Sequence, residues 1–344
     1  MQRFQKILVG VDLCDGNGII SDGLSATCRT AVDKALWLAG HTSAEVTFFS
    51  SLLPCLDLTP ATWQLAELHN YQSLIDSVHE KASSQMANLV AEAEAAGIKA
   101  KEVLAAGKPW FELLKEAVTN DYDLLIVGSH KQHALGRVLL GNTGRRLIRK
   151  CPCPVWVTSP VEDGQIRKLL VPTDFSETAT DSLEIAGSLA RQLNAELHVL
   201  HALEYHFEPI MRDLIVSVDN VEEFRSTMRS DAERQLNEVV SQCGLGDVVP
   251  LAHRHIAVGP PGVMIREAVE ELSVDLVVMS TLGRSGIKGM LVGNTAEQVV
   301  SHLTCSLLAI KPEGFQCPIE FPEICGDEGS ATTCPVVASK HQSH

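Results

Sequence analysis

The sequence predicts an α/β protein with two tandem domains, each built on a doubly wound, five-stranded parallel sheet. Three observations predict this fold class. Short apolar runs alternate with helix-length segments, an order that requires parallel pairing and right-handed crossovers. The apolar runs are nearly continuous, as expected for strands buried on both faces. The whole order of segments also occurs twice along the chain.

Length and composition agree with this interpretation. The 344 residues correspond to about two domains of ~150 residues. A net charge of −15 gives no global basic footprint, so we expect no nucleic-acid partner. No apolar stretch approaches the ~20 residues of a membrane span. The first strand follows Met1 within six residues, so we expect no signal peptide and a cytoplasmic location, with the ten scattered cysteines as reduced thiols.

The internal repeat identifies the two copies. The segment Lys6–Asp12 recurs 162 positions later as Lys168–Asp174. Four later features recur at a constant offset of 152 positions: Gly107 and Gly259, Asp123 and Asp275, Gly141–Thr143 and Gly293–Thr295, and Cys153 and Cys305. The polar segment Asp15–Gly23 has no counterpart in the second copy and is expected to be a surface loop insertion. Two copies of one domain explain this pattern.

Each copy is expected to run strand, helix, strand, helix, strand, helix, strand, helix, strand. The predicted strands are Ile7–Val11, Val46–Ser50, Lys99–Leu104, Leu124–Gly128 and Val155–Thr158, then Leu169–Thr173, Leu197–Ala202, Val249–His255, Leu276–Ser280 and Leu307–Lys311. The predicted helices are Thr30–Ala39, His69–Ala96, Trp110–Asn120 and Thr143–Lys150, then Thr178–Leu193, Val221–Cys243, Gly262–Leu272 and Thr295–His302. Gly97 stands where a C-cap glycine ends the second helix.

These elements divide the chain into residues 1–158 as the first domain, 159–167 as a polar linker, 168–313 as the second domain and 314–344 as a flexible tail. Within the tail, the short apolar segment Cys317–Phe321 is a candidate to pack back on the domains. The two last strands, Val155–Thr158 and Leu307–Ile310, are apolar sheet edges. An unpaired apolar edge is a liability that pairing removes.

The segment Asp275–Thr295 is typical of an anion site. A buried strand leads into a loop with four glycines, and a helix begins at Asn294 and Thr295. Glycine permits close approach of backbone N–H groups, and a helix start leaves several N–H donors unpaired. In parallel sheets, ligands bind outside the carboxyl ends of the strands, where the strand order reverses. Asp12 and Asp174 also follow strands and are expected there.

The span Gln5–Lys311 resembles a tandem universal stress protein. The family pattern of Gly, two residues, Gly, nine residues, Gly and Ser or Thr falls on Ser280, Gly283, Gly293 and Asn294 in the second copy, and on Gly128, Lys131, Gly141 and Asn142 in the first. The phrases Gly293–Val299 and Leu303–Pro312 look like the second domain of the E-type branch. The resemblance implies a Rossmann-like fold of the adenine nucleotide alpha hydrolase type, domains paired about a pseudo-twofold axis, and ATP as ligand. Further homodimerisation stays open.

The resemblance also assigns the site. In the second copy, Asp174 is expected to hold the base or the ribose, beside Pro172 and Thr173. The phosphates are expected to meet the backbone N–H groups of Gly283, Arg284, Gly293 and Asn294, with side-chain contacts from Arg284 and Thr295. Ser280 stands at a position where the family pattern has a glycine. The first-copy matches are Asp12, Gly128, Gly141, Asn142 and Thr143. Because Lys131 replaces a glycine, the second copy is favoured. The alternative for either loop is a strand-to-helix connection inherited from a binding ancestor.

Other functions stay open at this stage. A non-catalytic ATP-binding stress protein competes with a module for another metabolite, such as a lipid-linked or sugar-nucleotide ligand, and with a slow ATPase, for which no general base is identifiable. His253 and His255 lie two apart on a predicted strand, so they share a face and suit zinc or nickel if a third ligand arrives. The alternative is an exposed polar edge. His198 and His201 are predicted on opposite faces of one strand.

Overall fold

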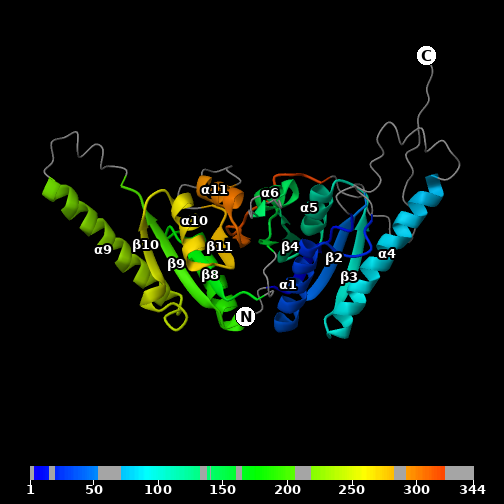
Figure 1. Ribbon diagram of the computed structural model, residues 1–344, viewed down its shortest axis with the longest axis horizontal. Coiled ribbons are helices and arrows are strands. Elements are labelled where there is room, and N and C mark those ends of the chain that lie inside the picture. Colours follow the sequence, from blue (N-terminus) through cyan, green and yellow to red (C-terminus); the bar gives the residue numbers. More distant parts are fainter. Residues whose placement is uncertain are drawn as a thin grey trace, which may run out of the picture.

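The computed structural model describes residues 4–14, 20–52, 71–131, 138–139, 141–159, 165–205, 218–282 and 292–321. Within these ranges, ten strands form one continuous sheet in the order β10-β9-β8-β11-β12-β7-β4-β1-β2-β3. Figure 1 shows the two halves side by side, with α4 and α9 at the outer ends. No helix in the described part of the chain is long and apolar enough to cross a membrane.

Among the described residues, the first half supplies five strands of the large sheet and four helices. The strands of the large sheet are β1 (Lys6–Gly10), β2 (Glu45–Ser51), β3 (Ala100–Ala105), β4 (Leu124–Gly128) and β7 (Val155–Thr158). The helices are α1 (Ala26–Thr42), α4 (Tyr71–Ala95), α5 (Pro109–Thr119) and α6 (Asn142–Lys150). A separate hairpin pairs β5 (His130–Lys131) with β6 (Val138–Leu139).

The second half repeats this plan. Its strands are β8 (Lys168–Pro172), β9 (Glu196–Leu203), β10 (Arg254–Val258), β11 (Leu276–Ser280) and β12 (Ser306–Ile310). Its described helices are α7 (Glu177–Leu193), α9 (Val218–Gln242), α10 (Pro261–Leu272) and α11 (Asn294–His302), with a single 3-10 turn, η1 (Leu251–His253). Within each half, all strand pairs of the large sheet are parallel. The predicted doubly wound fold is therefore confirmed.

The two halves join edge to edge through their last strands. β12 pairs with β7 antiparallel, with Leu308 opposite Trp156 and Ala309 opposite Val155. Because one strand of each half contributes, the antiparallel pairing places the halves about a pseudo-twofold axis. The expected intramolecular pairing of the two copies is thus present, and it covers both apolar edges.

Two apolar layers flank the sheet and run through both halves. One contains Val9, Phe48 and Trp156 together with Leu169 and Val199, and the other contains Leu8 and Phe49 with Leu170 and Leu307. Adjacent residues of one strand divide between the layers, as the period of two requires. Since each layer crosses the junction of β7 and β12, the halves share their cores. This sharing resists separation of the two domains.

The strand predicted at Val249–His255 is wrong in position. The structure begins β10 only at Arg254, and Leu251–His253 form the turn η1 after Pro250. Val249 is buried, whereas the side chain of Leu251 is 73% exposed. Proline lacks the N–H group that a strand interior needs, so the chain turns there before pairing with β9.

The segment after β12 returns to the first half. Lys311 is buried and its Nζ donates to the Ile148 carbonyl in α6. Further along, Cys317, Ile319 and Phe321 pack against an apolar layer, and the Phe321 ring lies 5.4 Å from the ring of Phe111 in α5. These contacts follow from the apolar character of Cys317–Phe321. The expected flexibility of residues 322–344 lies outside the described residues.

Candidate functional site

A cavity of about 640 Å³ lies in the second half at the carboxyl ends of parallel strands. Its walls come from the ends of β8, β9 and β11, from the loop before α10 and from the first turn of α11. The lining residues are Pro172–Asp174, Ala179, Leu200–Ala202, Glu204, Pro260, Pro261, Ile265, Met279–Leu282, Gly293–Ala296 and Gln298. Strand order reverses between β8 and its neighbours β9 and β11. The cavity therefore occupies the switch point at which such sheets bind ligands.

Most of the second-copy residues singled out from the sequence meet at this cavity. It is lined by Pro172, Thr173, Asp174, Ser280, Gly293, Asn294 and Thr295. Gly283 and Arg284 lie outside the described residues. The gathered residues come from two strand ends and one helix start, which only the fold brings together.

Asp174 is fixed by its own loop. Its Oδ1 accepts hydrogen bonds from the Ser176 N–H (3.1 Å) and from the Ser176 hydroxyl (2.6 Å). The Ser176 hydroxyl oxygen in turn accepts from the Ala179 N–H and so caps α7. These bonds hold the half-buried carboxylate at the cavity wall in one orientation.

An aromatic pair that the sequence analysis did not assign to the site stands beside Asp174. The His201 ring stacks on the Phe175 ring with a centroid separation of 4.2 Å and an interplanar angle of 28°. His201 Nδ1 lies 2.8 Å from the Thr173 carbonyl oxygen, so Nδ1 carries the proton and donates. Phe175 has a positive φ of 62°, which turns the chain at the cavity. The pairing of Pro172 with Leu200 in the strand register could have indicated this neighbourhood.

The start of α11 corrects one expectation. The Gly293 N–H, expected to face a phosphate, donates instead to the Thr281 carbonyl at 2.7 Å. Asn294, Thr295 and Ala296 form the first helical turn, whose N–H groups precede the first intrahelical bond, from Glu297 N–H to Gly293 O. Within the described residues, these three N–H groups have no hydrogen-bond acceptor. These N–H groups lie at the cavity, together with the positive end of the helix dipole. Both features stabilise an anion bound at that wall.

Ser280 has a structural task at its glycine position. Its hydroxyl donates to the Leu282 carbonyl at 2.6 Å, and the same carbonyl accepts from Thr178 Oγ1 at 3.0 Å. The Leu282 N–H returns a bond to Ser280 Oγ at 3.2 Å. The chain that leaves β11 toward the glycine loop is thereby tied to α7.

The first-copy candidates lie in a different setting. Asp12 is exposed and accepts from the Cys14 N–H at 3.1 Å. A Cβ atom on Gly128 would lie 2.7 Å from the Thr27 carbonyl oxygen, so glycine there permits α1 to pack directly on β4.

The other first-copy candidates lie around α6, where Gly141 is the N-cap and Asn142 and Thr143 form the first turn. Residues 132–137 and 140 of the intervening loop lie outside the described residues. Cys14 is disulfide-bonded, contrary to the expectation that every cysteine is a reduced thiol.

The histidines form a group larger than the sequence indicated. His253 lies in η1 rather than on a strand, and His255 lies on β10. His198 of β9 is buried between them, with its ring centroid 4.2 Å from that of His253 and 5.3 Å from that of His255. Burial, followed by the neighbouring His253 and His255, lowers the pKa of His198 to about 4, so this ring is neutral at pH 7. His198 and His201 contact different neighbours, since His198 Nδ1 lies 3.0 Å from His255 Nε2 and His201 Nδ1 lies 2.8 Å from the Thr173 carbonyl oxygen.

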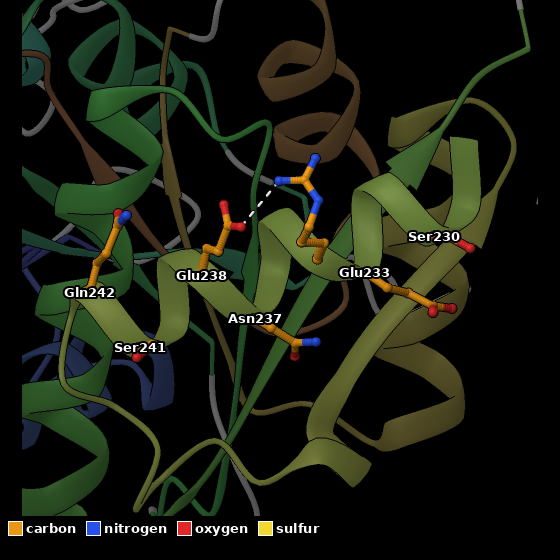
Figure 2. Close-up of a pocket in the computed structure, with 7 residues that line it drawn as sticks. Ser230, Glu233, Asn237, Glu238, Ser241 and Gln242 are labelled. Atoms are coloured by element: carbon orange, nitrogen blue, oxygen red, sulfur yellow. Dashed lines mark hydrogen bonds and ion pairs between the residues drawn. The ribbon is translucent and has the colours of Figure 1, made fainter. Parts of the chain in front are cut away.

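A second concave region lies on the outer surface of α9 (Figure 2). Its seven lining residues, Ser230, Glu233, Arg234, Asn237, Glu238, Ser241 and Gln242, all belong to this one helix and are exposed. Arg234 pairs with Glu238 at 3.1 Å along the helix. Exposed ion pairs of this kind contribute little to the stability of the fold, and they are typical of a solvated helix face rather than of a binding site.

Comparison with known proteins gives a consistent family. The family model for the universal stress protein family matches residues 3–159 and 165–311. Universal stress protein E of Photorhabdus laumondii is 24% identical over 330 residues, covering 93% of this chain and 99% of the relative. The protein of the same name from Escherichia coli K12 is 28% identical over 230 residues, covering 64% and 71%. A universal stress protein structure from Archaeoglobus fulgidus matches with a TM-score of 0.60 at 22% identity, covering 90% and 99%.

Proposed function

The chain belongs to the universal stress protein family, and we propose that it is a non-catalytic, cytoplasmic regulatory protein that binds ATP in the cavity of its second domain. The observation that carries this proposal is the convergence of the Asp174 carboxylate, the His201 ring and the first turn of α11 around one cavity at the switch point of the sheet. Each of these groups recognises a different part of a nucleotide.

The proposed contacts follow from the chemistry of each wall. The oriented Asp174 carboxylate suits hydroxyl donors of a ribose. The His201 ring, which lines the cavity and stacks on Phe175, offers an aromatic surface for a base. The N–H groups of Asn294, Thr295 and Ala296 suit a phosphate. The glycine loop with Gly283 and Arg284 would add the phosphate contacts expected from the sequence.

Other members of the family bind adenine nucleotides. One universal stress protein has been solved in complex with cAMP, and a member from Arabidopsis thaliana with AMP bound. Each covers less than half of this chain, with TM-scores of 0.29 and 0.31. The choice of the second domain therefore depends on the cavity of this chain itself.

A matched pair of variants tests the proposal. Gly293→Val changes the N-cap of α11 at the cavity, and Gly141→Val makes the equivalent change at the N-cap of α6 in the first domain. A Cβ on Gly293 would lie 3.5 Å from Thr281 O, an ordinary contact, and the circular dichroism spectrum of the variant should therefore match that of the wild type. Titration calorimetry with ATP should show binding to the wild type and to Gly141→Val, and none to Gly293→Val. Equal affinity in all three proteins would contradict the site.

The cavity wall also favours a second ligand class. Leu200, Ile265 and Met279 give it a continuous apolar side next to the polar groups. Such a wall suits a nucleotide that carries a sugar or lipid extension, because apolar groups leave water there. Mass spectrometry of ligand retained through purification separates the two candidates. Recovery of ATP or ADP alone would exclude the extended ligand.

A further inference from the structure

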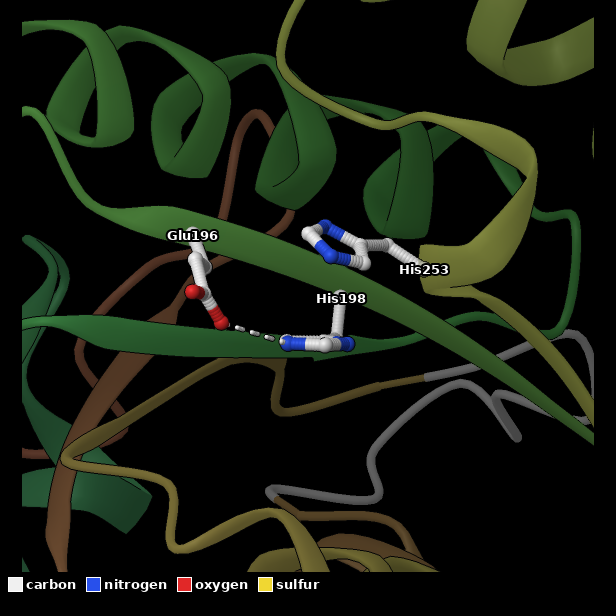
Figure 3. A group of neighbouring side chains, drawn as sticks. All are labelled: Glu196, His198 and His253. Carbon is white, nitrogen blue, oxygen red and sulfur yellow. Dashed lines mark ion pairs between the residues drawn. The ribbon is translucent and has the colours of Figure 1, made fainter.

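We propose that Glu196, His198 and His253 form a binding site for a divalent transition-metal ion, for which zinc is the probe, at the start of β9. Figure 3 shows Glu196 and His198 on this strand and His253 reaching them from η1. None of the three residues lines the nucleotide cavity, which lies at the other end of β9. The proposed site is thus separate from the proposed nucleotide site.

The spacing of the donor atoms fits one shared ion. One ligand atom from each residue lies within 4.8 Å of the other two. His198 Nε2 and Glu196 Oε2 are 3.6 Å apart, too far for a hydrogen bond. Two ligands about 2.1 Å from a tetrahedral zinc ion stand roughly 3.4 Å apart, so this pair needs little movement.

Two ring nitrogens at this place lack protein partners. Among the described residues, His198 Nε2 and His253 Nδ1 are buried and accept or donate no hydrogen bond. The His198 side chain is itself 95% buried, at a relative exposure of 5%. Burying a polar atom without a partner is costly, and such an atom calls for an explanation. A cation between the two nitrogens and the Glu196 carboxylate satisfies all three groups together.

The fourth side chain, His255, fits a supporting role. Its Nε2 lies 3.0 Å from His198 Nδ1, so one of these nitrogens donates to the other. When His198 Nε2 binds a metal, its Nδ1 carries the proton and donates to His255 Nε2. Metal-bound histidines almost always donate their second nitrogen in this way, which fixes the ring. His255 is therefore assigned as a positioning residue.

The first domain shows what the same scaffold does without these histidines. Glu45 occupies the position of Glu196, since each opposes the first residue of the preceding strand in the register, and Thr47 occupies that of His198. Glu45 binds Lys99 at 2.9 Å, so a lysine supplies the cation there. In the second domain, Lys168 Nζ is 3.9 Å from Glu196 Oε2, a looser and half-exposed pair. In the second copy, a neutral histidine therefore stands beside the glutamate, where the first copy has a closely bound lysine.

The donor set narrows the class of metal. Two imidazoles and one carboxylate suit zinc, and also cobalt or nickel, better than magnesium or calcium, which prefer oxygen ligands. Three protein ligands leave a position for water on the side of Glu196, whose side chain is 54% exposed. The ion would link β9 to η1 at the entrance to the edge strand β10, and so stabilise this edge.

Zinc competition against a chromophoric chelator tests the site on the full chain, after treatment with chelator and reductant. Glu196→Gln is isosteric and should weaken zinc binding about 10-fold or more, and His253→Ala more than about 100-fold. His255→Phe should weaken it about 10-fold, and His255→Gln, which restores an acceptor, should recover most of the affinity. His302→Ala removes an exposed histidine and serves as the control.

Cobalt gives an independent readout, because a tetrahedral site with nitrogen and oxygen ligands produces intense visible absorption. The wild type should develop this band at one cobalt per chain, and the double variant Glu196→Gln/His253→Ala should lose it while keeping its circular dichroism spectrum. The double variant keeps the cysteines and histidines of the C-terminal tail. If the folded double variant bound zinc with the stoichiometry and affinity of the wild type, the ion would be bound elsewhere in the chain and the proposal would be wrong. Failure of the wild type to bind zinc would overturn it as well.

Discussion

Lys311 provides a sharp test of how the two domains are joined. It follows β12 of the second domain, is only 7% exposed, and donates through Nζ to the Ile148 carbonyl near the end of α6 in the first domain. The ammonium group also lies 4.4 Å from the centroid of the Phe315 ring. Burial lowers the pKa of Lys311 from 10.5 to about 8, although the nearby Cys151 and Cys153 act in the opposite direction. We predict that this buried charge gives the protein a pH-dependent stability that Lys311→Met removes.

The magnitude and sign follow from proton linkage. A drop in pKa from 10.5 to about 8 corresponds to about 3 kcal/mol, at 1.36 kcal/mol per pKa unit. Between pH 8 and 10.5 the unfolded chain holds a proton that the folded chain has released, so the contribution of Lys311 to stability rises with pH. This contribution is fully present above pH 10.5 and is lost as the pH falls through about 8. At pH 7 the folded protein therefore carries the whole cost of the buried charge.

The measurement compares urea unfolding of the wild type and Lys311→Met at pH 7 and pH 10. The free energy of unfolding of the wild type should gain about 2–3 kcal/mol relative to the variant between these two pH values. Taking the difference cancels the ionisation of the tyrosines and of the cysteines that lie away from Lys311; Cys151 and Cys153, which interact with Lys311, do not cancel. A difference that stays constant within about 0.5 kcal/mol would show that Lys311 is solvated and that the junction is looser than described.

Two further predictions concern single backbone positions. Gly128→Ala in β4 should lower the free energy of unfolding by about 1–3 kcal/mol, because its Cβ would lie 2.7 Å from the Thr27 carbonyl oxygen in α1. Gly40→Ala, within α1 itself, meets nothing within 4 Å and should raise the free energy of unfolding by about 0.5–1 kcal/mol. Equal effects of the two variants in urea titrations would contradict the close packing of α1 on β4. Ser273→Gly should raise the free energy of unfolding by about 1 kcal/mol, because Ser273 is the C-cap of α10 and has a left-handed φ of 54°. Ser301→Gly, inside α11, should lower the free energy of unfolding. A lower melting temperature for Ser273→Gly than for the wild type would refute this prediction.

The fold was predictable because its signals are local and occur twice. Parallel strands buried on both faces give continuous apolar runs, and the constant offset between the copies aligned weak segments with strong ones. The pairing of β7 with β12 was implied by the family resemblance, and it agrees with the two apolar edges that need a partner. The start of β10 was missed because Val249 and Leu251 continue the apolar pattern, although Pro250 between them cannot pair inside a sheet.

The site was predictable only as far as its strand ends. Asp174 and the start of α11 follow directly from the alternation of strands and helices. The hydrogen bond from the Gly293 N–H to the Thr281 carbonyl could not be predicted from the sequence, because it depends on how the two ends of the glycine loop meet. The sequence pattern did not indicate His198 as a metal ligand, because His201, the nearest histidine on the same strand, is predicted on the opposite face. The contacts that matter for it cross from β9 to η1 and β10.

The two domains use equivalent positions of one scaffold for different contacts. At equivalent positions, Gly128 admits the backbone of α1, whereas Ser280 ties the start of the glycine loop to α7 through the Leu282 carbonyl. Glu45 is likewise neutralised by a lysine, whereas Glu196 faces a buried histidine. In each comparison the second domain has a polar side chain where the first has a glycine or a lysine-bound glutamate, and so the two copies differ at equivalent positions. Because the shared core ties the halves together, a ligand bound in the second domain would also stabilise the first. Both halves should therefore unfold together at a higher urea concentration when ATP or zinc is present.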